Sequence, residues 1–178
     1  MAKVYVERLM ESVLERKLNS SGCVLVTGTK SCGKSTMCLR HAKSVTELKT
    51  QNDIEVARTD PNSALKGEAP HLIDEWQKSP DIWNRIKKDL DDDCVFGKYI
   101  ITGSTTPLDS KGIQHSGAGR IASMTLKPFT LYESGESSGA VSLKDLLEGD
   151  GTGFESVFEK ENPSGLDDIY AEVVGRSR

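Results

Sequence analysis

The sequence predicts an α/β fold in which strands and helices alternate along the chain. The first observation is a short apolar run at 23–26 that leads directly into residues 28–35, GTKSCGKS, which match the pattern G-x-x-x-x-G-K-[ST]. The second is the run 71–73, which ends in an acidic pair, and the third is 99–101, which ends in small polar residues. Each run reads as a short buried strand, and helix-like segments lie between them.

The loop at 28–36 has the composition of a phosphate-binding Walker A motif. Its glycines let the backbone approach a chain of negative oxygens closely, and the N-terminus of the following helix offers unpaired N–H groups. Lys34 is expected to reach the β- and γ-phosphates, and the Ser35 hydroxyl is expected to bind Mg²⁺. A chance glycine-rich turn is the alternative. The expected nucleotide-binding residues are Gly28, Thr29, Lys30, Ser31, Cys32, Gly33, Lys34, Ser35 and Thr36.

The acidic pair after the second strand fits a Walker B motif. Asp74 is expected to hold Mg²⁺ and Glu75 to act as the general base toward water, although an exposed acidic turn would look similar. Thr102 and Ser104, at the end of the third strand, are the candidates for positioning that water. A plain strand-terminating turn is the alternative for them.

Composition narrows the class of protein. The chain has 178 residues, 36% hydrophobic and 28% charged, as expected for one folded domain. A net charge of −4 disfavours nucleic acid as a partner. There is no apolar run long enough for a membrane span or a signal peptide, and the four cysteines form no C-x-x-C pair, so we expect a cytoplasmic protein with free thiols and no structural metal.

Hydrophobic spacing predicts the remaining elements. Further helices are expected over 4–18 and 35–45, from Pro80 through Leu90, over 143–147 and from 167 to 174. Further strands are expected over 54–59 and 121–126. We also expect a single helical turn at 64–67 and an exposed loop at 132–142. Cys32 raises a separate hypothesis, because a thiol next to a helix N-terminus is activated and its oxidation or alkylation could block nucleotide binding.

Taken together, these segments resemble the N-terminal ATPase core of prokaryotic AAA-type P-loop ATP-binding proteins that usually carry an uncharacterised C-terminal domain. The resemblance rests on the phosphate loop and on four further blocks: LIDEWQ at 72–77, ITGS at 101–104, HSGAGRI at 115–121 and LKPFTLYESGESS at 126–138.

The resemblance implies a three-layer P-loop NTPase fold. Its sheet would be mostly parallel, with the phosphate-loop strand central, an extra strand inserted beside it, and helices on both faces. Residues 1–165 would form the ATPase core, and 166–178 would begin a truncated helical lid. The resemblance also implies that Arg120 senses the γ-phosphate of a neighbouring subunit in a homo-oligomer. Relatives often have Asn where Thr102 or Ser104 stands here.

The expected function is therefore hydrolysis of ATP with Mg²⁺ by in-line attack of water. The expected catalytic residues are Lys34, Glu75, Thr102, Ser104 and Arg120, and the expected metal ligands are Ser35 and Asp74. The alternative is a nucleotide-dependent switch or interaction module that does not hydrolyse ATP. The sequence does not identify a protein partner.

Overall fold

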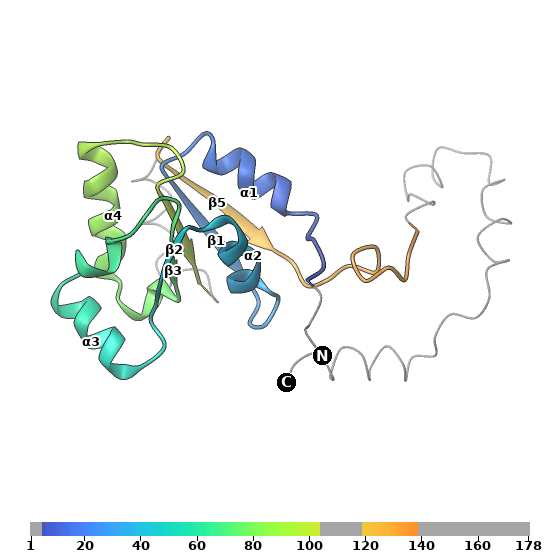
Figure 1. Ribbon diagram of the computed structural model, residues 1–178, viewed down its shortest axis with the longest axis horizontal. Helices are drawn as coiled ribbons and strands as arrows, with labels where there is room; N and C mark the ends of the chain where they lie inside the picture. Colours follow the sequence, from blue (N-terminus) through green and yellow to red (C-terminus); the bar gives the residue numbers. More distant parts are fainter. Residues whose placement is uncertain (1–4, 104–118, 139–178) are drawn as a thin grey trace, which may run out of the picture. The chain divides into compact units, whose positions relative to one another are not determined.

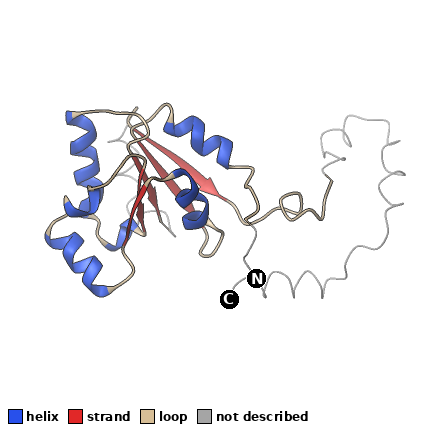
Figure 2. Ribbon diagram, viewed as in Figure 1, coloured by secondary structure: helices blue, strands red, loops and turns tan. Residues whose placement is uncertain are grey.

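The computed structural model describes residues 5–103 and 119–138. The chain divides into two units, Met1–Phe129 and Thr130–Arg178, and each is described by itself. The described helices and strands all belong to the first unit (Figure 1 and Figure 2). In chain order they are α1 (Glu11–Leu18), β1 (Cys23–Gly28), α2 (Lys34–His41), β2 (Ser44–Glu47), α3 (Gln51–Thr59), η1 (Ser63–Leu65), β3 (His71–Asp74), η2 (Trp76–Lys78), α4 (Asp81–Asp92), β4 (Tyr99–Thr102) and β5 (Ile121–Leu126).

The strands form one parallel sheet in the order β2-β3-β4-β1-β5. β4 lies between β1 and β3, which confirms the extra strand beside the phosphate-loop strand. β1 is an interior strand, one position from the β5 edge. Because all strands run the same way, the carboxyl ends of β1, β3 and β4 meet at one edge of the sheet.

Alternation along the strands divides the core into two halves. Cys23 and Leu25 of β1 pack toward α3 and α4, whereas Val24 and Val26 pack toward α1 and α2. Figure 2 shows the resulting three layers, with the sheet between the two pairs of helices. The buried Trp83 of α4 belongs to the first half of the core.

The helix predicted over 4–18 is only partly correct. α1 begins at Glu11, and the residues before it form an extended and turning segment in which Val6 and Leu9 are exposed. This segment is instead held by polar contacts of Tyr5 and Arg8, which are described with the site below. Hydrophobic spacing could not reveal those contacts.

The prediction was wrong in the region after the phosphate loop. The helix expected over 35–45 ends at His41, and β2 at Ser44–Glu47 forms the edge strand that pairs with β3. The strand expected over 54–59 is the second half of α3. Thr50 and Asp53 form a reciprocal capping box at the start of this helix, which outweighs the alternation of apolar residues.

Most other expected elements are confirmed. β1, β3, β4 and β5 occupy the predicted positions, Pro80 precedes α4, and η1 supplies the single helical turn. In the second unit, residues 130–138 form hydrogen-bonded turns, in which Glu133 accepts from the N–H of Thr130 at 2.8 Å. The helices expected at 143–147 and 167–174, and the boundary expected at 165, lie outside the described residues.

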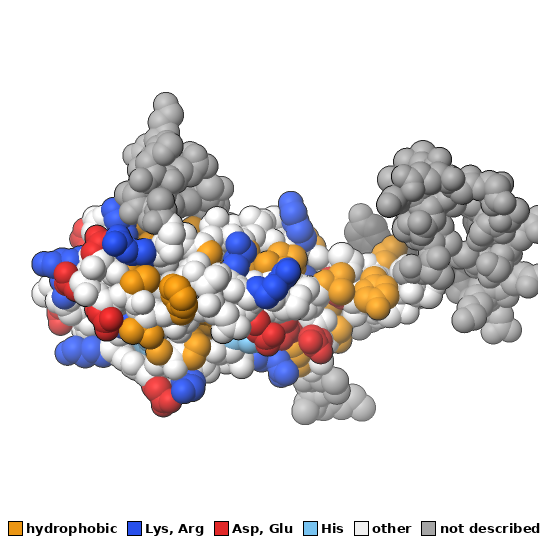
Figure 3. Space-filling model, turned by 90° about the horizontal axis from the view of Figure 1, so that it is seen from above, with side chains coloured by type: hydrophobic (Ala, Val, Ile, Leu, Met, Phe, Trp, Pro, Cys, Tyr) orange, Lys and Arg blue, Asp and Glu red, His pale blue; other side chains and the backbone are white. Residues whose placement is uncertain are grey.

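The surface is mixed in character. On the face drawn in Figure 3, acidic and basic side chains of the described residues are interspersed, with hydrophobic side chains between them. The described part of that face therefore presents no continuous basic stripe of the kind that attracts nucleic acid. Among the helices that the structure describes, none has the length and apolar character needed to cross a membrane.

Candidate functional site

The loop between β1 and α2 wraps around a small cavity. A Cβ on Gly28 would overlap the backbone carbonyl oxygen of Leu126, so this position at the end of β1 requires glycine. Gly33 has a φ of 92°, in the left-handed region, immediately before α2 begins. The cavity measures about 220 Å³ and is lined by Lys30, Ser31, Gly33, Lys34, Ser35, Thr36 and Glu75. The loop, the start of α2 and Glu75 of the acidic pair thus line one cavity.

Lys34 is buried within the loop. Its ammonium group donates to the carbonyl oxygens of Gly28 at 3.0 Å and Thr29 at 2.7 Å. These contacts hold a positive charge at the wall of the cavity, beside the backbone N–H groups at the start of α2. Such a wall suits a chain of phosphates.

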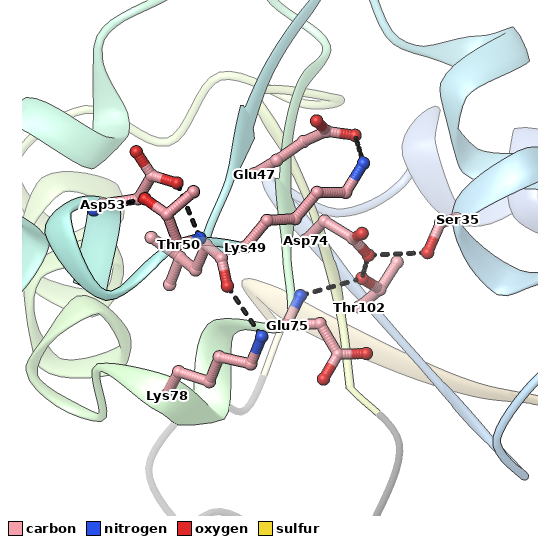
Figure 4. Close-up of polar contacts among 10 residues, drawn as sticks. Ser35, Glu47, Lys49, Thr50, Asp53, Asp74, Glu75, Lys78 and Thr102 are labelled. Carbon is pink, nitrogen blue, oxygen red and sulfur yellow. Dashed lines mark hydrogen bonds and ion pairs between the residues drawn. The ribbon is translucent and has the colours of Figure 1, made fainter.

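Asp74 is the centre of a buried polar network at the carboxyl edge of the sheet (Figure 4). The Ser35 hydroxyl donates to its Oδ1 at 2.7 Å, and the Thr102 hydroxyl donates to the same oxygen. The N–H of Glu75 donates to Thr102 Oγ1 at 3.3 Å. The network exists because β4 lies between β1 and β3, which places Thr102 beside both the loop strand and the acidic pair.

Thr102 therefore has a different position from the one expected for a residue that holds water. It is fully buried, and its hydroxyl joins the Asp74 carboxylate to the backbone of Glu75. Ser104, the other candidate, lies outside the described residues.

Glu75 has a backbone conformation that is rare for its residue type. Its φ of 62° and ψ of 41° are left-handed, at a cost of roughly 1–2 kcal/mol for a residue with a Cβ. The Gln77 side-chain amide donates to Glu75 Oε2 at 2.7 Å, and the Glu75 side chain lines the cavity. The strained backbone thus accompanies a carboxylate at the phosphate loop.

Arg120 is not brought to the phosphate loop of its own chain. It directly precedes β5, and its carbonyl accepts from the N–H of Cys23, at the beginning of β1. The loop begins at the other end of β1, roughly 20 Å away along six strand residues. The half-exposed guanidinium forms an ion pair with Asp91 of α4.

The surroundings of Cys32 bear on the oxidation hypothesis in two ways. The thiol is buried and points to the carbonyl of Leu126, with Sγ at 3.5 Å from that oxygen. Cys38 of α2 is also buried, and burial raises its pKa well above the ordinary thiol value. Burial shields the Cys32 thiol from reagents, whereas the Lys34 ammonium, 3.9 Å from its Sγ, would stabilise a thiolate, so the hypothesis of a reactive thiol at Cys32 stays a prediction.

Arg8 is a site residue that sequence reasoning missed. The residue is 4% exposed, and its Nη1 donates to the Cys32 carbonyl at 2.7 Å. Its Nη2 donates to the Lys127 carbonyl at 2.8 Å, and the group lies 4.1 Å from the centre of the Phe129 ring. No local pattern distinguishes this arginine, because its partners lie 24 and 119 residues along the chain.

Glu11 fixes the segment that carries Arg8. Its Oε1 accepts from the Arg8 N–H at 2.8 Å and from the Tyr5 hydroxyl at 2.5 Å, and its Oε2 lies 3.0 Å from His41 Nε2. Burial alone would raise the pKa of Glu11, but these hydrogen bonds outweigh burial and lower it. The carboxylate is therefore ionised and ties the segment to α2.

Comparison with known proteins identifies the family. Residues 20–135, more than half of the chain, match the AAA domain family. The uncharacterized proteins Mb2031c of Mycobacterium bovis and Rv2008c of Mycobacterium tuberculosis are each 32% identical to this chain over 130 residues. These matches cover 70% of this chain and 29% of each relative, so the chain spans less than a third of the length of those proteins.

Among solved structures, PCH-2 of C. elegans aligns with a TM-score of 0.34 and 12% identity, over 65% of this chain and 40% of that one. That likeness is too distant to carry an argument about the site. The family match includes the phosphate loop, the acidic pair and all five strands of the sheet, because all of these lie between residues 20 and 135. The chain therefore belongs to the AAA domain family and is a nucleotide-binding protein of the P-loop type.

Proposed function

We propose that this chain binds ATP with Mg²⁺ and hydrolyses it. The observation that carries the proposal is the single cavity shared by the phosphate loop, the first turn of α2 and Glu75. A binding loop alone would serve a switch equally well. A carboxylate that faces the same cavity supports a reaction there.

The oxygen atoms beside the loop fit a magnesium ion. Mg²⁺ prefers oxygen ligands and commonly takes one or two from the protein. Ser35 Oγ and Asp74 Oδ1 lie 2.7 Å apart at the cavity edge, so the hydroxyl would bind the ion directly and the carboxylate would hold its hydration shell. When bound, the ion would neutralise charge on the β- and γ-phosphates.

The remaining residues divide the reaction between them. Lys34 binds phosphate oxygens, and Glu75 accepts a proton from the attacking water. The new bond joins the water oxygen to the γ-phosphorus, and the bond from the γ-phosphorus to the β–γ bridging oxygen breaks, which releases ADP and phosphate. Thr102 holds Asp74 and the Glu75 backbone in place.

Arg120 belongs to this proposal only through a second subunit. Because it lies at the opposite end of β5 from its own loop, it would reach a γ-phosphate only from a neighbouring chain. In that position it would stabilise charge in the transition state. We therefore propose a homo-oligomer whose sites are completed between subunits.

Phosphate release tests the proposal. The full chain is assayed with ATP and Mg²⁺, beside Glu75→Gln, which keeps the size of the side chain and its hydrogen bond with Gln77 but removes the base. We expect turnover in the wild type and a loss of at least tenfold in the variant, with ATP binding retained in both. ATP binding without turnover in either protein would instead support a nucleotide-dependent switch.

A further inference from the structure

Arg8 lies beneath the phosphate loop rather than in its cavity. Its Nη1 holds the Cys32 carbonyl and is so close to the loop that a Cβ added at Gly33 would be 3.3 Å from it. Arg8 does not line the cavity. A buried guanidinium is costly unless its donors are satisfied, so this placement calls for an explanation.

The bond to Cys32 determines the direction of one N–H group. The Cys32 carbonyl and the Gly33 N–H belong to the same peptide, and in a trans peptide these two groups point in opposite directions. Holding the carbonyl toward Arg8 therefore turns the Gly33 N–H away from it, on the side where Gly33 lines the cavity. Gly33, with φ of 92°, would otherwise turn about this peptide with little steric resistance.

The other contacts of Arg8 fix its position from two sides. Nη2 holds the Lys127 carbonyl just after β5, and the guanidinium stacks against Phe129. On the other side, the backbone of Arg8 is bound by the ionised Glu11. Figure 1 shows the segment before α1 beside the chain that leaves β5. The guanidinium thus contacts the loop from a segment that is itself held by Glu11, Lys127 and Phe129.

We propose that Arg8 is a positioning residue for nucleotide binding: it holds the Cys32–Gly33 peptide so that the Gly33 N–H faces the phosphates. Arg8 acts through the loop backbone and makes no contact with the nucleotide. This role rests on the proposed function in one respect: the ligand of the loop is a nucleotide. It does not require that the nucleotide be hydrolysed.

The test compares Arg8→Ala and Arg8→Lys with a matched control, Arg40→Ala, in the full chain. Arg40 also stacks on a ring of the N-terminal segment, at 4.3 Å from the centre of Tyr5, but no described contact joins it to the loop. ADP affinity is measured by titration calorimetry, and folding by circular dichroism. We expect affinity to fall roughly 10- to 100-fold in Arg8→Ala, less in Arg8→Lys, and not in Arg40→Ala, as for loss of a charge-assisted hydrogen bond.

A second measurement separates a change in the orientation of the Gly33 N–H from a general loss of folding stability. The amide signal of Gly33, followed by NMR without nucleotide, should shift in both Arg8 variants while signals of β3 stay unchanged. Unchanged ADP affinity and an unchanged Gly33 amide in Arg8→Lys would overturn the proposal, as would an equal loss of affinity in Arg40→Ala. If Arg8→Ala does not fold, Arg8→Lys decides. A wild-type chain that binds no nucleotide would refute the proposed function instead, and the Gly33 amide would still test the orientation of the loop.

Discussion

Removing the Thr102 hydroxyl isolates the contribution of the Asp74 network. Thr102→Val keeps the shape of this fully buried side chain but removes a donor to Asp74 and the acceptor for the Glu75 N–H. A hydrogen bond to a charged group contributes about 1.5–3 kcal/mol, and burial of the added methyl group returns about 0.8 kcal/mol. The net loss in free energy of unfolding is therefore about 1–2 kcal/mol.

The loss is large enough to measure by thermal unfolding. For a chain of this length it corresponds to a fall in Tm of about 2–8 °C. Thr102→Ser is the matched control, because it keeps the hydroxyl and loses only the methyl group. A Thr102→Val protein as stable as the wild type would refute the reasoning, since the carboxylate would then have no need of its buried donor.

Three further outcomes follow from groups outside that network. Burial lowers the pKa of His71, so the folded chain keeps this imidazole neutral while the unfolded chain takes up a proton near pH 6.5; stability should fall as pH drops below about 6.5, by up to 1.4 kcal/mol per pH unit. Urea unfolding at several pH values measures this, and a slope that persists in His71→Gln would contradict the assignment. Arg120→Ala should change the free energy of unfolding by less than about 1 kcal/mol, because its pair with Asp91 is exposed, yet it should abolish any rise of specific ATPase activity with protein concentration. A variant whose activity still rises with concentration would exclude Arg120 from a neighbouring site. Among the thiols, the exposed Cys94 should react with a thiol reagent well before the buried Cys32, and mass spectrometry of a brief labelling reaction would show the reverse order if the loop opens readily.

The sequence predicted the part of the site whose chemistry is local. The phosphate loop and the acidic pair depend on residue types at fixed spacing after a short apolar strand. The fold places Glu75 at the cavity of the loop and joins Asp74 to Ser35 of the loop by a hydrogen bond. The prediction that a strand lies between β1 and β3 came from the family resemblance. The residue types at 99–102 predict a buried strand but do not indicate which strands pair with it.

Long-range contacts explain what the sequence did not reveal. Arg8 binds carbonyl groups near residues 32 and 127, so its role depends on tertiary structure and not on its neighbours in the chain. α3 was mistaken for a strand because Ile54, Val56 and Ala57 suit either element over six residues. The capping box from Thr50 to Asp53 was the missed signal, and it lies just before the segment that was interpreted.

The backbone of Glu75 has a consequence for how this chain can vary. Glycine would adopt the left-handed conformation without the penalty of a Cβ, so a chain selected for folding stability alone would gain from Glu75→Gly. We expect that substitution to raise or preserve the Tm and to remove ATP turnover together. Under the proposed function, a glutamate at this position costs folding free energy but supplies the carboxylate for hydrolysis, so stability and activity would place opposite demands on this one residue.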